Sequence, residues 1–262
     1  MPYIDYVDIQ MGDGLVCDAY VSLPKGVEPG VKVPAILFLM DGIGLRPRLE
    51  EMADTIAQQG YYVIAPNLFY RAARAPVVPD IQELLAQGPE GREKLITAIF
   101  KHIVTLTPDL FLPDVTKYID YIDQQTDYVV SGAPIGVVGY CMGGTNAVRV
   151  ACAHPTRVAA LGCFHAANLV TDQPDSPHLQ LGAIKGCRFH FGHADHDDFN
   201  TPQQIATLEK TLSDLHIDAS SEVYKDAPHA YTMKDSAMYQ KEGEEKHWVE
   251  LESLLTKTFK SK

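Results

Sequence analysis

The sequence predicts a doubly wound α/β fold, with a mostly parallel sheet of about eight strands and flanking helices. Short apolar runs alternate with segments of helical periodicity along most of the 262 residues. The run at 35–40 is apolar at every position, as expected of a central parallel strand covered on both faces. A third observation also indicates this fold: a short apolar run at 135–138 is followed by a glycine-rich turn and then by a segment that can be helical.

The first part of the chain should begin with an antiparallel pair. Residues 3–10 and 16–23 are the expected strands, and the Gly12-Asp13-Gly14 sequence between them favours a tight turn. The strand at 35–40 is followed by a helix at 47–59, where apolar residues recur at helical spacing, and by a strand at 61–65. These three elements form a strand-helix-strand unit.

The middle of the chain is less regular. Pro108 and Pro113 interrupt the helical pattern between 66 and 126, so we expect separate helices at 81–87, 91–105 and 114–125. Beyond the glycine-rich turn, strands are expected at 158–164, 187–192 and 221–224, with helices at 202–215 and 244–259. We expect a single domain over residues 1–262, with 72–113 forming a cap or lid over the site.

Composition excludes several classes of function. The net charge is −12 and the sequence holds no basic run, which argues against binding to nucleic acid or to an anionic membrane surface. Residues 1–10 lack the basic start and apolar centre of a signal peptide, and no apolar stretch is long enough to span a membrane. The five cysteines form no C-x-x-C pair, so neither a zinc ribbon nor a disulfide framework is indicated. We expect a cytoplasmic protein.

Cys141 lies at the centre of a glycine-flanked motif, Gly139-Tyr140-Cys141-Met142-Gly143-Gly144. Glycines two residues before and after the cysteine are typical of a nucleophile elbow, a strained strand-to-helix turn that leaves no room for bulky neighbours. The thiol would then stand at the carboxyl end of a parallel strand. The amide of Met142, at the start of the helix, would point at a developing oxyanion.

A nucleophilic cysteine needs a histidine base and a carboxylate that orients the base. In this type of fold the chain order is nucleophile, then carboxylate, then histidine. Asp195 follows the expected strand at 187–192, and His229 lies in the loop after the next strand. Asp197 and Asp198 compete with Asp195 for the same role, but Asp195 follows its strand by the shortest link. All these loops leave the carboxyl ends of strands, where active sites of such sheets lie.

On these motifs the chain resembles the dienelactone hydrolase (carboxymethylenebutenolidase-like) family of the α/β-hydrolase superfamily. The resemblance covers nearly the whole chain. It implies an α/β-hydrolase fold in which Cys141 is the nucleophile, His229 the general base and acid, and Asp195 the orienting carboxylate.

The resemblance also suggests further site residues. Asp41 stands where dienelactone hydrolases proper carry a glutamate that manages the proton of the thiol, and the amide of the next residue, Gly42, is the candidate second oxyanion donor. Tyr70 and Arg71 are candidates for substrate binding, because Arg71 matches the place of one arginine that grips a substrate carboxylate. A second such arginine, a few residues after the histidine, has no counterpart, since 230–235 contains Lys234 and no arginine.

The chemistry of a thiol narrows the expected substrates. A tetrahedral intermediate on sulfur expels thiolate easily, so the forward reaction is favoured when the other leaving group is good. We therefore expect a hydrolase of activated esters or lactones (enol lactones, aryl esters or thioesters) that acts through a covalent acyl-thioester and uses no cofactor. The expected partner is a small-molecule ester or lactone, and the oligomeric state stays open.

Two other classes of function remain open. A metal-dependent hydrolase could use the cluster from His190 to Asp198, which is rich in histidine and aspartate (His190, His193, Asp195, His196, Asp197 and Asp198). The His-x-His-x-Asp-His spacing of one common metallohydrolase family would, however, need a histidine where Phe191 stands. The second alternative is a catalytically silent relative that serves as a binding protein.

Overall fold

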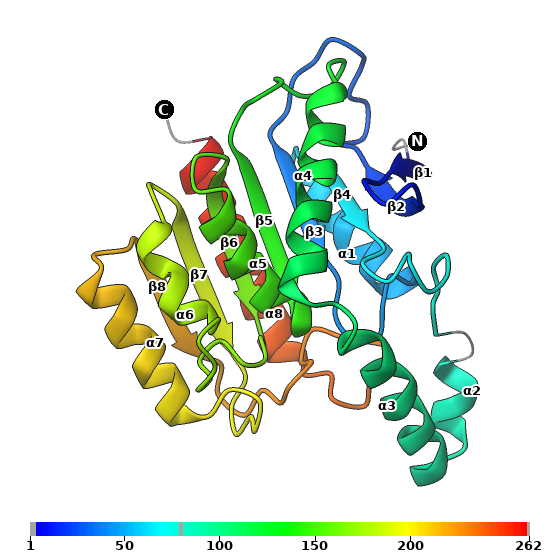
Figure 1. Ribbon diagram of the computed structural model, residues 1–262, viewed down its shortest axis with the longest axis vertical. Helices are drawn as coiled ribbons and strands as arrows, with labels where there is room; N and C mark the ends of the chain where they lie inside the picture. Colours follow the sequence, from blue (N-terminus) through cyan, green and yellow to red (C-terminus); the bar gives the residue numbers. More distant parts are fainter. Residues whose placement is uncertain (1–3, 79–80, 261–262) are drawn as a thin grey trace.

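The computed structural model describes residues 4–78 and 81–260. An eight-stranded sheet crosses the molecule in the order β1-β2-β4-β3-β5-β6-β7-β8 (Figure 1). β1 pairs antiparallel with β2, and β2 pairs antiparallel with β4, whereas every later pair is parallel. The predicted fold class is confirmed. The strands are β1 Ile4–Gln10, β2 Val16–Ser22, β3 Ala35–Leu39, β4 Tyr62–Pro66, β5 Ile135–Tyr140, β6 Val158–Phe164, β7 Arg188–His193 and β8 Ala219–Val223.

Helices cover both faces of the sheet, which explains why β3, β4 and β5 are buried at every position. One face carries α1 and α8, which contact β4 and β6 respectively, and the other carries α5, which packs on β5 and against α4 (Figure 1). The helices are α1 Pro47–Gln58, α2 Ile81–Ala86, α3 Pro89–Ile103, α4 Pro108–Gln124, α5 Met142–Ala153, α6 Pro177–Gln180, α7 Pro202–Asp214 and α8 Lys241–Phe259, with a 3₁₀ turn at Leu181–Ala183.

Most expected elements are present within a few residues of the expected ends. Of the first expected strand, residue 3 lies outside the described residues, and β1 begins at Ile4. β8 begins at Ala219, two residues before its expected start. α8 begins at Lys241 and not at 244, because the side chain of Gln240 accepts a hydrogen bond from the amide of Gly243 and caps the helix there.

The expectation that a helix begins at 114, after Pro113, is wrong. α4 runs without a break from Pro108 to Gln124, with Pro113 inside it. An internal proline removes one helical hydrogen bond and costs about 3 kcal/mol or more. The helix buries Phe111, Val115, Tyr118 and two isoleucines, and burial of large apolar side chains contributes roughly 1.5–3 kcal/mol each. Packing of this face therefore outweighs the cost of the proline.

α2 and α3 lie beyond the lower edge of the sheet in Figure 1, the edge toward which the parallel strands run. They pack on each other. Within the described part of the chain, no single helix is long and apolar enough to cross a membrane. One pair of helices, Glu90–Ile103 and Pro108–Gln124, has together the length and composition of a membrane span, but the pair is bent by 77°.

Candidate active site

Cys141 stands between β5 and α5 in a strained backbone conformation, with φ of 53°. L-residues other than glycine rarely adopt positive φ, so the surrounding structure must hold it there. A Cβ added at Gly139 would lie 2.1 Å from the carbonyl oxygen of Gly143, and one added at Gly143 would lie 2.4 Å from that of Leu39. The two glycines therefore permit the close packing that forces the turn, and Cys141 remains partly exposed at its tip.

His229 connects this cysteine to a carboxylate. Its Nε2 lies 3.0 Å from Sγ of Cys141, and its Nδ1 lies 2.7 Å from Oδ2 of Asp197. The Asp197 side chain is only 2% exposed and that of His229 19%. Burial alone would lower the pKa of His229, but the thiolate charge of Cys141 and the hydrogen bond to Asp197 outweigh it and raise the pKa to about 10. The ring of His229 is thus placed to hold a proton between the Cys141 sulfur and the Asp197 carboxylate.

Asp195, the predicted orienting carboxylate, does not contact His229 in the structure; the carboxylate that does is that of Asp197. The Asp195 carboxylate accepts a hydrogen bond from the amide of Asp226 at 3.0 Å, and its own amide donates to the carbonyl of Ala227. The chain then turns at His196, whose φ is 53°, and returns so that Asp197 faces the histidine. Asp195, the aspartate nearest to the end of the strand, thus joins its loop to the loop that contains Asp226 and Ala227. Asp197, two residues later, is the aspartate that faces His229.

The two predicted oxyanion donors lie at the ends of neighbouring strands. Leu39 of β3 pairs with Gly139 of β5, so Gly42 and Met142 each follow within three residues of a paired position. Met142 is the first residue of α5, and the first amides of a helix have no partner within the helix. Gly42 belongs to a turn in which the amide of Ile43 donates to the Asp41 carboxylate. Both amides are thus at the edge of the sheet that carries Cys141.

Asp41 faces an arginine that the sequence analysis did not single out. Arg46 donates from Nη1 to Oδ1 of Asp41 at 2.8 Å and from Nη2 to Oδ2 at 3.0 Å. Its Nε also donates to Asp235 at 2.6 Å, and the Arg46 side chain is 3% exposed. The structure does not bring Asp41 to the thiol, as the thiol-tuning prediction requires, because both of its carboxylate oxygens are directed to this guanidinium.

Tyr70 and Arg71 are likewise engaged elsewhere. Arg71 forms a two-pronged ion pair with Asp114 of α4, at 2.6 and 2.9 Å, and its Nε contacts Asp13 at 2.8 Å. The Tyr70 hydroxyl donates to the same Asp114, and the guanidinium lies 4.5 Å from the centre of the Tyr70 ring. The structure places these two predicted substrate-binding residues in a cluster that joins the loop after β4 to α4 and to the β1–β2 turn.

Two further side chains lie against His229. Phe199 is 44% exposed and its ring centre is 5.0 Å from that of His229. His165 follows β6 directly, is fully buried, and lies 5.5 Å away on an edge-to-face contact. Burial holds the pKa of His165 well below its usual value, so the ring is neutral. Its position directly after a parallel strand was the sequence signal that could have identified it.

The residues of the metal alternative point in different directions. His190 contacts Ser220 and Tyr224, and His193 contacts Ser221 and Asn200. The side chains of His196 and Asp198 are exposed. Over the described ranges, no group of three or more histidine, cysteine, aspartate or glutamate side chains is arranged to hold a metal ion.

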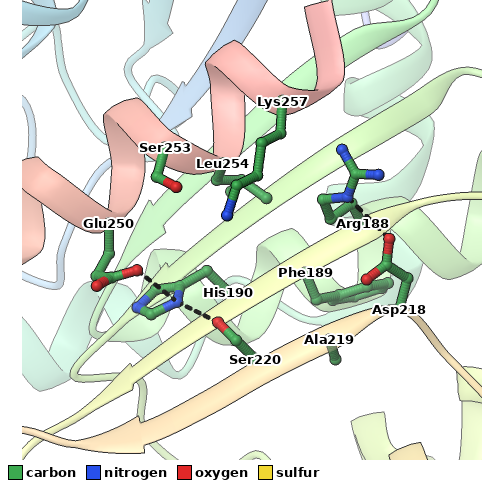
Figure 2. A pocket seen from close by; sticks show the side chains of 10 residues that line it. All are labelled: Arg188, Phe189, His190, Asp218, Ala219, Ser220, Glu250, Ser253, Leu254 and Lys257. Atoms are coloured by element: carbon green, nitrogen blue, oxygen red, sulfur yellow. Dashed lines mark hydrogen bonds and ion pairs between the residues drawn. The ribbon is translucent and has the colours of Figure 1, made fainter. Parts of the chain in front are cut away.

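A separate cleft of about 410 Å³ lies between α8 and the strands β7 and β8 (Figure 2). Among its lining residues, Arg188 and Asp218 form an ion pair and His190 forms a hydrogen bond with Ser220. Its lining includes none of Cys141, Asp197 and His229.

Comparisons with known proteins find relatives that match most of the chain. The sequence profile of the Dienelactone hydrolase family matches residues 17–259. Carboxymethylenebutenolidase of Rhodococcus opacus is 28% identical over 229 residues, covering 81% of each chain, and that of Pseudomonas putida is 24% identical over 236 residues, covering 89% of this chain and 88% of the relative.

Solved structures show the same fold. A Klebsiella pneumoniae subsp. pneumoniae protein, provisionally described as a dienelactone hydrolase, superposes with a TM-score of 0.80 at 18% identity, covering 98% of this chain and 99% of its own. The dienelactone hydrolase-like promiscuous phosphotriesterase P91 from metagenomic libraries gives a TM-score of 0.71 at 16% identity, with the same coverage.

Proposed function

Because this chain belongs to the dienelactone hydrolase family, we propose that it hydrolyses activated esters or lactones through a covalent intermediate on Cys141. The observation that carries this proposal is the position of His229, with one ring nitrogen 3.0 Å from the thiol and the other 2.7 Å from a buried carboxylate. This is the relationship that nucleophile, base and orienting acid need. The names of the curated relatives support ester or lactone hydrolysis as the reaction class.

In the first half of the reaction, the thiolate of Cys141 attacks the carbonyl carbon and a carbon–sulfur bond forms. The carbonyl electron pair moves to oxygen, and the amides of Met142 and Gly42 stabilise the oxyanion. When the oxyanion collapses, the carbon–oxygen bond to the leaving group breaks and the imidazolium of His229 gives its proton to the departing oxygen. The product of this half is a thioester on Cys141.

In the second half, neutral His229 takes a proton from water as the water oxygen attacks the thioester. The second tetrahedral intermediate expels the thiolate and leaves a carboxylic acid, and the imidazolium is restored beside the thiolate. Asp197 keeps the ring in one orientation and balances its charge in both halves. Neither half needs a cofactor.

The preference for activated substrates follows from the first intermediate. It can expel either the thiolate or the alcohol oxygen, and the thiolate leaves more easily than an ordinary alkoxide. Aryl esters, enol lactones and thioesters have leaving groups good enough to compete, whereas amides and simple alkyl esters do not. An aryl acetate is therefore a suitable first substrate.

The test is acylation of the protein by p-nitrophenyl acetate. Wild type should release p-nitrophenol and carry one acetyl group on Cys141, detected by mass spectrometry after rapid quenching. Cys141→Ala should show neither, while the matched variant Cys152→Ala, which alters a buried cysteine on α5, should keep both. Turnover by Cys141→Ala at the wild-type rate would overturn the proposal.

A further inference from the structure

We propose that this site, given the cysteine hydrolase function proposed above, accepts uncharged substrates and discriminates against substrates that carry a carboxylate. Two groups of observations support the proposal. Four cations near the site, Arg46, Arg48, Arg71 and Lys234, are each paired with carboxylates of the chain itself. Apolar side chains contact Gly42 and one side of His229.

Arg46 has its donors committed to internal acceptors. Its guanidinium bonds both oxygens of Asp41, both oxygens of Asp235 and the carbonyl oxygen of Gly44. The side chain is 3% exposed, so a substrate carboxylate could reach it only by displacing one of these buried partners. One cation here faces two anions, and the cluster has a net negative charge.

Arg48 and Lys234 form a second cluster near the loop that carries His229. Arg48 bonds Glu244, Glu51 and the carbonyl oxygen of Thr232, three residues after the histidine. Only its Nε lacks a partner, and that atom is fully buried. Lys234, the one cation in 230–235, lies 3.3 Å from Glu244 and 3.7 Å from Glu51. Arg48 is thus closed off by its partners, and the half-exposed Lys234 is shared between two glutamates of the chain.

Arg71 forms the third cluster. Two of its guanidinium nitrogens pair with Asp114 and the third pairs with Asp13, while the Tyr70 ring lies over one face of the guanidinium. Across the three clusters, four cations face six carboxylates. The protein as a whole carries a net charge of −12. An anionic substrate would therefore approach against an unfavourable potential, with no unpaired guanidinium of these three arginines to receive it.

Two of the contacts at the site are apolar. A Cβ added at Gly42 would lie 2.6 Å from Cδ1 of Ile103 and 3.2 Å from Cγ2 of Ile99, so α3 packs directly on the candidate oxyanion loop. On the other side, the half-exposed ring of Phe199 lies against His229. A neutral, apolar substituent gains by contact with such side chains, whereas a carboxylate loses hydration there without a compensating partner.

The experiment compares one enol lactone in two forms, carboxymethylenebutenolide as its free carboxylate and as its methyl ester. Each kcat/KM is divided by the rate of hydrolysis by hydroxide, because the ester is intrinsically the more reactive. The normalised value should be at least about tenfold higher for the methyl ester, or about 1.4 kcal/mol in transition-state binding. Because salt screens charge repulsion, the difference should shrink between about 0.02 and 0.5 M sodium chloride.

Two variants of Ile103 test whether the discrimination against the carboxylate arises at the site. Ile103→Lys puts a cation beside Gly42 and should raise the ratio of carboxylate to ester turnover, whereas Ile103→Met, of similar length and no charge, should leave that ratio near the wild-type value. An equal or higher normalised kcat/KM for the free carboxylate would overturn the inference. The proposed function fails separately, and takes this inference with it, if wild type hydrolyses neither lactone form and p-nitrophenyl acetate does not acylate Cys141.

Discussion

Oδ2 of Asp197 lies 2.7 Å from Nδ1 of His229, although 32 residues separate them. Asp195 lies two residues earlier on the same loop and bonds a backbone amide instead. The two aspartates thus form a natural matched pair, one aimed at the histidine and the other at the neighbouring turn.

Asp197→Asn should lower kcat for p-nitrophenyl acetate by roughly 10²–10⁴-fold, because an amide neither balances the imidazolium nor favours the required tautomer. Asp195→Asn should stay within about threefold of wild type, because Asp195 does not contact His229 and the asparagine oxygen can still accept from the Asp226 amide. Steady-state kinetics of both variants at pH 7 measures this. A larger loss from Asp195→Asn than from Asp197→Asn would restore the assignment made from sequence.

The elements themselves were predictable because they depend on local patterns. Apolar runs and helical periodicity identify strands and helices wherever both faces or one face are buried, as in β3 and α1. Pro113 is the instructive exception, since a local rule about proline was overridden by packing of α4 on the core. The elbow was also local, because its glycines and cysteine lie within six residues.

The charge network of the site was not predictable in the same way. Arg46 is separated from Asp235 by 189 residues, and no pattern in either segment indicates that they meet. The choice among Asp195, Asp197 and Asp198 depends on how one short loop turns at His196. Arg71 lay where the family resemblance suggested a substrate ligand, but only the fold shows that Asp13 and Asp114 bind it.

Gly139→Ala should destabilise the protein by about 1–3 kcal/mol or more, because its Cβ would overlap the carbonyl of Gly143 and overpacking of this kind costs that much. Gly182→Ala is the control, since nothing lies within 4 Å of a Cβ at that position. Urea unfolding of the two variants measures the difference. Equal midpoints for Gly139→Ala and wild type would show that the elbow is not as tightly packed as described.

Arg46→Met should lower the free energy of unfolding by about 3–5 kcal/mol, because it leaves the carboxylates of Asp41 and Asp235 near each other without their cation. Asp235→Asn in the Arg46→Met background should recover part of that loss by removing one of the two charges. A double-mutant cycle from chemical denaturation gives the coupling. Strictly additive losses would contradict the described pairing of Arg46 with Asp235.

The protonation of His229 gives a pH-dependent prediction. Its folded-state pKa is about 10, above the ordinary value of about 6.5, so the folded protein holds a proton that the unfolded chain has lost in this window. The contribution of this group to stability is complete below pH about 6.5 and is lost as the pH rises toward 10. Turnover should also fall at the upper end, since the leaving group then lacks its proton donor.

The measurement is an NMR titration of the His229 ring protons. Cys141→Ala should shift the titration of His229 to lower pH, because the thiolate is the largest of the influences that raise its pKa. Cys152→Ala should leave it unchanged. A wild-type His229 that titrates below about 6.5 would show that burial outweighs the thiolate and Asp197.

His165 should act as a positioning residue for the histidine loop. Its Nε2 lies 2.8 Å from Oγ1 of Thr232, and its ring packs edge-to-face against His229, while its backbone φ is 36°. His165→Phe keeps an aromatic ring but leaves the Thr232 hydroxyl without that partner, which should cost about 1–3 kcal/mol of stability. We expect kcat to fall more than KM changes, because substrate contacts stay while the base loses its fixed position.

The control is the double variant of His165→Phe with Thr232→Val. It removes the hydroxyl that lost its partner and should recover stability without recovering kcat. Recovery of both together would mean that His165 supports the fold alone and has no separate effect on His229.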